Sequence, residues 1–373
     1  MSVAIANSQR LPANFPNGLN ITASVHNLVQ ALTISSHGGL DRLELRDDLP
    51  QPDVRRPGDV RIRIRAAALN RLDLFVVAGL PGVTIAPPWI LGADACGVID
   101  AIGGDVDTVG LGDYVVVNPG LSDRTCEYCR DGEQPLCPRF GLLGEHFPGT
   151  LSEYLVVPAA NVRTIPETVP PEEAAAFTLA TLTAWRMLVS RAHVQPDEDV
   201  LIWGIGGGVA LAALQICKQL GARTWAVSSS DEKLKRAAEL GADVTLNYRQ
   251  VDVARTIRDR TGKRGVDVVV DNVGKATWDQ SLRALGRRGR LVSCGATSGP
   301  VVETDLRRMF WNQWSILGST MGNDAEFDAV VGELRAGRLR PPIDSVHTLA
   351  DSRAAFERLE TGAQFGKVVV RIS

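Results

Sequence analysis

The chain has 373 residues, which is too long for one ordinary domain and suits two. Its hydrophobic fraction of 45%, charged fraction of 22% and net charge of −3 are typical of a soluble globular protein and disfavour nucleic acid or an anionic membrane as partners. No apolar stretch reaches the roughly 18 residues of a membrane span. Residues 1–28 lack the basic start and apolar run of a secretory signal, so we expect an N-terminal extension on a cytoplasmic protein.

Short β-type runs, broken by Gly and Pro, dominate the sequence before Pro170. Few stretches in this half show the spacing of a long amphipathic helix. The pattern predicts a compact, mostly antiparallel β domain. The expected strands are Val60–Ala68, Val98–Ile102, Tyr114–Val117 and Tyr154–Val157.

Three of the six cysteines lie within a twelve-residue segment of this β-rich half. Cys126 and Cys129 have the Cys-x2-Cys spacing that lets two sulfurs reach one zinc ion. Cys137 follows eight residues later, and Asp123 offers a carboxylate as the fourth ligand. A closed shell of four ligands leaves no position for a substrate, so a zinc ion here would be structural. The alternative is a loop that carries free cysteines without metal.

From Val200 onward, short apolar runs alternate with amphipathic stretches of helical length. This alternation predicts a doubly wound α/β domain, in which helices cover both faces of a parallel sheet. The expected strands are Val200–Trp203, Thr224–Val227, Val244–Leu246, Val266–Asp271, Arg290–Ser293 and Ser315–Ser319. The expected helices are Val209–Leu220, Asp231–Leu240 and Val251–Thr261. A final helix, Ala350–Glu360, and strand, Lys367–Ile372, are expected to pack back on the first domain.

A glycine cluster joins the first strand of the α/β half to its first helix. Gly204, Gly206, Gly207 and Gly208 precede Val209, where the helical pattern begins. Glycine allows a tight turn and lets the backbone approach a pyrophosphate without an obstructing Cβ, and the helix N-terminus then offers N–H groups to the phosphates. In this strand–helix context, the cluster predicts a dinucleotide-binding site.

The choice between NAD and NADP is read near the end of the second strand, about twenty residues further on. Ser228 and Ser229 stand there, with Lys233 close behind. Hydroxyl donors and an ammonium group suit the 2′-phosphate of NADP(H), which an acidic residue would repel. Asp231 and Glu232 lie near and are interpreted as helix-capping and first-turn charges.

Several motifs in a fixed order resemble the medium-chain dehydrogenase/reductase superfamily from about Val29 to Ser373. Besides the cysteine segment and the glycine loop, they are Ala68–Asp73, Leu91–Asp94, Val109–Val115, Gly149–Tyr154, Thr181–Trp185 and Phe365–Val369. The resemblance implies a GroES-like catalytic domain, residues 29–165 and 322–373, and a Rossmann dinucleotide-binding domain, residues 166–321. It also implies a dimer or a dimer of dimers, in which the strand near Ile316–Ser319 pairs across a two-fold axis.

Within this superfamily, the zinc alcohol dehydrogenases hold a catalytic zinc with Cys, His, and Cys or Asp. The matching positions in this chain are Asn70, Ala93 and Leu179, none of which supplies such a ligand. Without ligands there is no Lewis acid to activate an alcohol. The chain therefore resembles the zinc-independent quinone oxidoreductases, although it keeps the alcohol-dehydrogenase-type cysteine lobe.

That resemblance implies roles for individual residues. Asn70 and Thr183 are expected near the nicotinamide, and Ser228, Lys233 and Tyr248 near the 2′-phosphate. Asn272 and Gly295 are expected to line the cofactor cleft, and Lys367 of the last motif completes the cofactor-binding set. The acidic Asp73 is interpreted as a fold-supporting residue, His146 as a loop residue and Trp89 as a core residue.

We expect an oxidoreductase that transfers a hydride from NADPH to a quinone, enone or similar conjugated carbonyl without a catalytic metal. Two alternatives remain open. One is an alcohol dehydrogenase of the zinc family with an unrecognised set of ligands, and the other is a non-catalytic NADP(H)-binding redox sensor.

Overall fold

The computed structural model describes residues 27–373, which form two compact units. The first unit contains the described residues through Thr178, together with Ile343–Ala363 and Val368–Ser373. The second contains Leu179–Pro342 and Gln364–Lys367. The division differs from the expected boundaries in the segments 166–178, 322–342 and 364–367. The expected N-terminal extension, apart from its last two residues, lies outside the described residues.

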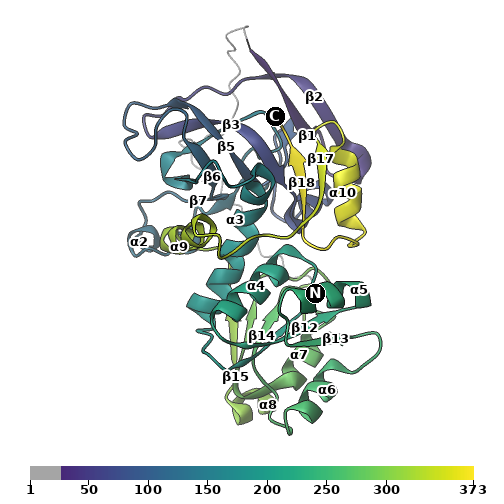
Figure 1. Cartoon of the computed structure of the whole chain (residues 1–373). Coiled ribbons are helices and arrows are strands. Elements are labelled where there is room, and N and C mark those ends of the chain that lie inside the picture. The colour runs from purple at the N-terminus through teal and green to yellow at the C-terminus, as the bar shows by residue number, and fades with distance from the viewer. Residues whose placement is uncertain (1–26) are drawn as a thin grey trace. The chain divides into compact units, whose positions relative to one another are not determined.

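The first unit is built mainly of antiparallel strands, as predicted (Figure 1). Its largest sheet has the order β10-β6-β5-β3-β18-β17, and β9 pairs with the first half of β3, Asp59–Arg63. The strands of this sheet are β3 (Asp59–Ala68), β5 (Asp94–Ile102), β6 (Tyr114–Val117), β9 (Tyr154–Pro158), β10 (Val162–Thr164), β17 (Ile343–Thr348) and β18 (Lys367–Arg371). Strand β18 pairs with β3 through Val369 and Ala68, so the tail completes this sheet as expected.

Smaller elements surround the large sheet. A second sheet has the order β2-β1-β4, and a two-stranded ribbon joins β7 to β8 near the cysteine lobe. These strands are β1 (Leu28–Ile34), β2 (Leu43–Pro50), β4 (Trp89–Ile90), β7 (Gly120–Leu121) and β8 (Gly141–Leu142). The helices of the unit are α1 (Arg71–Ala78), α2 (Glu127–Arg130) and α10 (Ser352–Glu360), and α3 (Pro171–Trp185) begins in it.

Two elements of the first unit differ from the sequence prediction. Strand β5 begins at Asp94, four residues before the expected Val98, and so includes the segment Asp94–Gly97. Helix α1 was not expected, because eight residues give too short a window to show helical spacing. It forms because its apolar residues Val76 and Val77 enter the core beside Phe356 of α10.

The second unit has a six-stranded, wholly parallel sheet of order β13-β12-β11-β14-β15-β16. The order reverses at β11, the first strand along the chain, as in a doubly wound fold. The strands are β11 (Asp199–Ile202), β12 (Arg223–Ser228), β13 (Val244–Asn247), β14 (Val266–Asp271), β15 (Leu285–Ser293) and β16 (Ser315–Gly318). The helices are α4 (Gly208–Gln219), α5 (Asp231–Glu239), α6 (Val253–Arg260), α7 (Trp278–Ala284), α8 (Leu306–Asn312) and α9 (Asp324–Arg335), and a π-helical segment, Arg186–Arg191, follows α3.

Local chemistry explains where these helices begin. The Ser230 side chain accepts a hydrogen bond from the backbone N–H of Lys233, and Asp252 caps α6 in the same way through Arg255. The cap of α5 is therefore Ser230 rather than Asp231. Strand β15 starts at Leu285, five residues before the expected Arg290. The sequence did not predict this first half because it is polar and glycine-rich and shows no apolar alternation.

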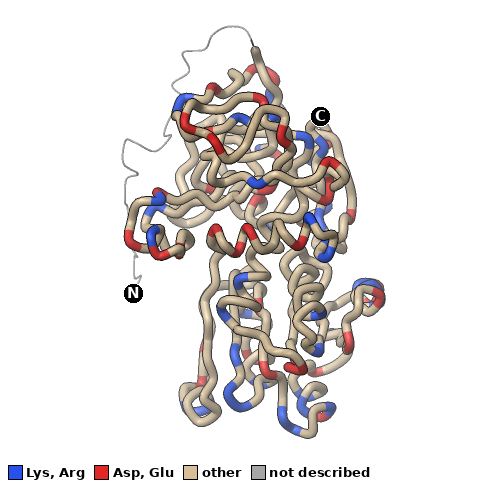
Figure 2. Tube along the Cα trace, turned by 60° about the vertical axis from the view of Figure 1, so that its left-hand side comes forward, with Lys and Arg blue, Asp and Glu red and all other residues tan. Residues whose placement is uncertain are grey.

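The described residues contain no helix that is long and apolar enough to cross a membrane. Acidic and basic residues occur along both units of the chain (Figure 2).

Candidate functional site

The glycine loop has the backbone geometry that the sequence requires of it. Gly204 has φ = 72° and Gly206 has φ = 114°, values that residues with a Cβ rarely adopt. Gly207 is the N-cap of α4 and has no side chain to cap the helix itself. The loop thus presents the open N-terminus of a twelve-residue helix to an anion.

Two lysines and the C-terminal segment lie against this loop. A Cβ on Gly206 would meet Lys233 Cδ at 2.9 Å, and a Cβ on Gly208 would meet Lys367 Cδ at 3.0 Å. The backbone N–H of Gly366 donates to the carbonyl of Gly206 at 2.9 Å. The loop therefore has two cationic side chains beside it, which favours a phosphate-bearing ligand.

Asn272 lies between the glycine loop and the end of β15. A Cβ on Gly204 would lie 3.5 Å from Asn272 Oδ1, and one on Gly295 would lie 3.4 Å from the Asn272 carbonyl oxygen. The structure thus brings together Gly204, Asn272 and Gly295, which the sequence places in three separate segments.

Just after β12, the carboxylate of Asp231 already accepts hydrogen bonds from neighbouring side-chain amides. Asp231 accepts hydrogen bonds from Asn247 Nδ2 at 2.7 Å and from Gln250 Nε2 at 3.0 Å. Ser228 is buried, and its carbonyl accepts from the backbone N–H of Tyr248, whose side chain is exposed. Ser229 and Lys233 are partly exposed. The sequence analysis did not identify Asn247 and Gln250 as neighbours of Asp231. Two amide residues close to Tyr248 were the feature that could have indicated them.

A cofactor of the dinucleotide class fits buried polar atoms around the loop. Gln364 Oε1 and Trp203 Nε1 are buried and have no hydrogen-bond partner among the described residues. The backbone carbonyl oxygen of Gln364 lies 3.5 Å from the Cβ position of Gly206. Trp203 directly precedes Gly204, and its side chain packs in the hydrophobic core of the unit. Buried polar groups in folded proteins are nearly always paired, so the side-chain oxygen of Gln364 is an acceptor that a bound polar ligand would satisfy.

In the first unit, Asn70 is held by a buried carboxylate. Asn70 is the N-cap of α1, and its Nδ2 donates to Asp94 Oδ2 at 2.9 Å. The other carboxylate oxygen of Asp94 accepts from Thr178 Oγ1 at 2.6 Å. Ala93, the position of the family's His ligand, is fully buried and offers only a methyl group. Thr178 was missed in the sequence, because nothing local marks a contact across 84 residues.

Thr183 is buried in the second unit, and its hydroxyl is bonded within its own helix. Its Oγ1 donates to the Leu179 carbonyl at 2.7 Å and contacts Met321 Sδ at 3.7 Å. A hydroxyl engaged in this way supports helix geometry first, and because its one proton is used it could meet a ligand only as an acceptor.

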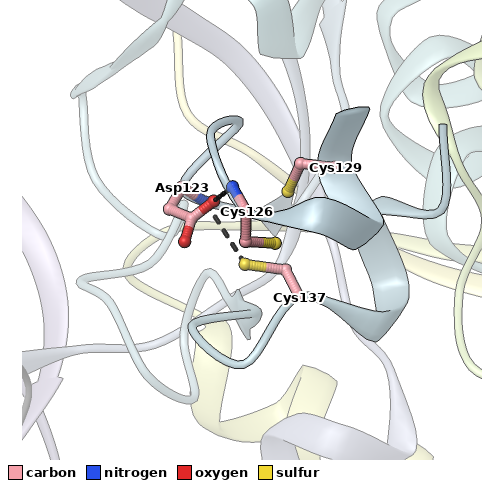
Figure 3. A group of neighbouring side chains, drawn as sticks. All are labelled: Asp123, Cys126, Cys129 and Cys137. Atoms are coloured by element: carbon pink, nitrogen blue, oxygen red, sulfur yellow. Dashed lines mark hydrogen bonds between the residues drawn. The ribbon is translucent and has the colours of Figure 1, made fainter. Parts of the chain in front are cut away.

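The cysteine segment folds into a group of four side chains suited to a metal ion (Figure 3). The ligand atoms of Asp123, Cys126, Cys129 and Cys137 all lie within 4.8 Å of one another. No other group of three or more His, Cys, Asp or Glu side chains in residues 27–373 is placed to hold a metal. Three sulfurs and one carboxylate form a donor set that zinc accepts in closed tetrahedral sites.

The carboxylate and the thiols of this group differ in how readily they ionise. Burial would raise the pKa of Asp123, but backbone N–H groups of Cys126 and Thr125 donate to its carboxylate and hold that pKa below its ordinary value. Burial raises the pKa of the Cys129 thiol to about 12. Asp123 is thus ready to bind as an anion, whereas Cys129 must lose a proton when a metal binds.

The sequence analysis interpreted three further residues as structural, and each makes a hydrogen bond within the protein. Asp73 Oδ2 accepts from the backbone N–H of Asn70 at 2.7 Å and stabilises the start of α1. Trp89 is buried, and its indole N–H donates to the Gly144 carbonyl at 2.8 Å. His146 is in a loop, where its ring nitrogen Nδ1 lies 3.3 Å from the backbone nitrogen of Leu142.

Comparison with known proteins gives the same family for both halves of the chain. Residues 56–167 match the alcohol dehydrogenase GroES-like domain, and residues 208–336 match the zinc-binding dehydrogenase domain. An alcohol dehydrogenase of Geobacillus stearothermophilus is 31% identical over 341 residues, covering 88% of this chain and 97% of that protein. A quinone oxidoreductase of Pseudomonas aeruginosa is 30% identical over 355 residues, covering 92% and 99%.

A solved structure supports the same assignment. The crystal structure of an NAD-dependent alcohol dehydrogenase superposes with a TM-score of 0.88 at 42% identity, covering 92% of this chain and all of that one. Its similarity extends over the β-rich unit and the parallel-sheet unit, as the predicted GroES-like and Rossmann domains require. The chain therefore belongs to the medium-chain dehydrogenase/reductase superfamily and is an oxidoreductase of that family.

Proposed function

We propose that the protein is an NADPH-dependent reductase that transfers a hydride to a conjugated carbonyl, such as a quinone or an enone, without a catalytic metal. The observation that carries this proposal is the chemistry at two ligand positions of the family. Asn70 points its amide at Asp94, and Ala93 is a buried methyl group. Neither side chain can replace a thiolate or an imidazole as a zinc ligand.

The nicotinamide cofactor supplies the hydride in such a reaction, and the protein holds both reactants in place and excludes water. Gly204, Gly206 and the start of α4 would hold the pyrophosphate, with Lys233 and Lys367 beside it. Reduction of a quinone takes one hydride from the cofactor and one proton from solvent, and it leaves a hydroquinone and the oxidised cofactor.

The preference for NADPH rests on the end of β12. In an NAD site, a free carboxylate there would bind the ribose hydroxyls. Asp231 instead accepts hydrogen bonds from Asn247 and Gln250. The residues proposed to contact the 2′-phosphate are Ser228, Ser229, Lys233 and Tyr248. The names of several relatives specify NAD, so this preference is proposed for this chain alone.

A second candidate activity is alcohol oxidation, since similar proteins are named alcohol dehydrogenases. The two activities are separated by titrating the purified protein with NADPH and NADH and then supplying 1,4-quinones, enones or primary alcohols. Oxidation of NADPH that depends on a quinone or enone supports the proposal. Reduction of NAD by alcohols would overturn it, and binding without turnover of any acceptor would indicate a redox sensor.

We also propose that Asp123, Cys126, Cys129 and Cys137 hold one structural zinc ion. Their donor set and spacing fit zinc, and the carboxylate corner distinguishes the site from one with four thiolates. A zinc ion here would tie the loop between β7 and β8 without taking part in hydride transfer.

We propose further that the protein forms a homodimer through β16, which is the last strand of its sheet. An unpaired strand edge invites pairing with another chain, and a two-fold axis satisfies it with a second copy. Helix α8, directly before this strand, has no buried residue and exposes Leu306, Phe310 and Trp311 to 68%, 68% and 74%. Apolar side chains so placed are typical of a protein–protein interface.

Trp311→Glu combined with Phe310→Glu is expected to shift the protein from dimer to monomer, because it places charges in the proposed interface. Sedimentation velocity at micromolar concentration measures the change. Leu111→Glu is the matched control, since Leu111 is a 65% exposed leucine in a loop of the first unit. A wild-type protein that sediments as a monomer would refute the dimer.

A further inference from the structure

The environment of Asp94 suggests a role beyond packing. Asp94 is the first residue of β5 and is completely buried. Each of its carboxylate oxygens accepts a side-chain hydrogen bond, Oδ1 from Thr178 at 2.6 Å and Oδ2 from Asn70 at 2.9 Å. Its carbonyl oxygen accepts a third bond, from Thr150 Oγ1 at 2.9 Å. These contacts hold the carboxylate in one orientation.

This arrangement determines which way the Asn70 amide faces. A carboxylate accepts hydrogen bonds, and of the two ends of an amide only the NH2 group donates. The Nδ2 atom of Asn70 therefore faces Asp94, and it also lies 3.4 Å from the carbonyl of Ala68. The reversed amide would set its oxygen against a carboxylate oxygen, so the carbonyl group of Asn70 faces away from Asp94.

We infer that Asp94, supported by Thr178, is a positioning residue that orients the Asn70 amide for the reaction. The inference rests on the proposed function, in which Asn70 lies beside the reacting groups. The NH2 group of Asn70 is directed at Asp94, and its amide oxygen accepts from the backbone N–H of Asp73 in the capping box of α1. An amide oxygen has two lone pairs, so the second would accept from an N–H or O–H of the bound reactants. Asn70 does not donate to the negative charge that develops on the carbonyl being reduced.

A double-mutant cycle tests whether Thr178 acts through Asn70. The variants are Thr178→Val, Asn70→Ala and their combination, with kcat and KM measured for NADPH and a 1,4-quinone. Loss of one buried hydrogen bond corresponds to a decrease in kcat/KM of about fivefold for Thr178→Val. In the Asn70→Ala background the same change is expected to have almost no effect. Equal factors in both backgrounds would overturn the inference.

Two further variants separate positioning from stability. Thr178→Ser keeps the hydroxyl and is expected to keep wild-type kcat/KM. Thr224→Val is the matched control, because Thr224 is also fully buried and donates to a carboxylate, that of Asp243, at 2.9 Å. It is expected to lower the melting temperature without lowering kcat/KM. A similar loss of kcat/KM in Thr224→Val would show that stability alone explains the Thr178 result.

A readout without turnover keeps this inference distinct from the proposed function. With ¹⁵N-asparagine labelling, the Asn70 side-chain NH2 signals are assigned by their loss in Asn70→Ala. We expect slow solvent exchange of these protons in the wild type and fast exchange in Asp94→Asn or Thr178→Val. Fast exchange in the wild type would refute the orientation even if the quinone is reduced. Slow exchange in a protein that reduces no acceptor would refute the function alone.

Discussion

Gly206→Ala is expected to weaken NADPH binding by about 5- to 150-fold, since a backbone conformation that disfavours a side chain costs about 1–3 kcal/mol. Gly206 has φ = 114°, and a Cβ there would lie 2.9 Å from Lys233 Cδ. The substitution both strains the loop and displaces Lys233, which we propose contacts the cofactor. Quenching of protein fluorescence by NADPH measures the dissociation constant.

Gly332→Ala serves as the matched control for this variant. Gly332 lies within α9 of the same unit, and a Cβ there would meet nothing within 4 Å. Because alanine favours a helix over glycine by roughly 1 kcal/mol, this variant is expected to melt at a higher temperature and to bind NADPH as the wild type does. Unchanged NADPH affinity in Gly206→Ala would mean that the cofactor does not approach the glycine loop.

Cys137→Ser is expected to remove the proposed zinc and with it a large part of the stability of the first unit. Elemental analysis should fall from one zinc per chain to none. Occupancy at 100 times the dissociation constant stabilises a folded protein by about 2.7 kcal/mol, so the melting temperature should fall by several degrees. A chelator should lower the wild type to the same value and leave the variant unchanged.

Two comparisons make the zinc prediction specific. Cys217→Ser changes a buried cysteine of α4 outside the group and should retain zinc even if it loses stability. Asp123→Cys should bind zinc more tightly, because thiolate is a better zinc ligand than carboxylate. A wild-type protein that contains no zinc and melts at the same temperature with and without a chelator would identify the segment as a loop of free cysteines.

The sequence predicts what depends on local pattern. Alternating apolar runs identified the parallel sheet, and glycines after the β11 strand identified the turn into α4. The Cys-x2-Cys spacing identified the group around Asp123, because its members lie within fifteen residues. In each case the residues that act together are also close in the chain.

Contacts between distant segments could not be predicted in this way. The bond from Thr178 to Asp94 joins residues 84 positions apart, and neither has a neighbour that marks it. The role of Asp231 depends on Asn247 and Gln250, which reach it only because β12 and β13 are adjacent. Propensity and spacing describe single elements, whereas such pairs depend on how elements meet.

The pairing of β18 with β3 has a consequence for the order in which the protein can fold during synthesis. Val369 and Ala68, which are partners in this pair, are separated by about 300 residues of chain. The sheet of the first unit is therefore incomplete until β18 has left the ribosome. All six strands of the second unit's parallel sheet are made earlier. On the ribosome, the nascent first unit must persist with an open strand edge, so it is the half that most needs protection by a chaperone.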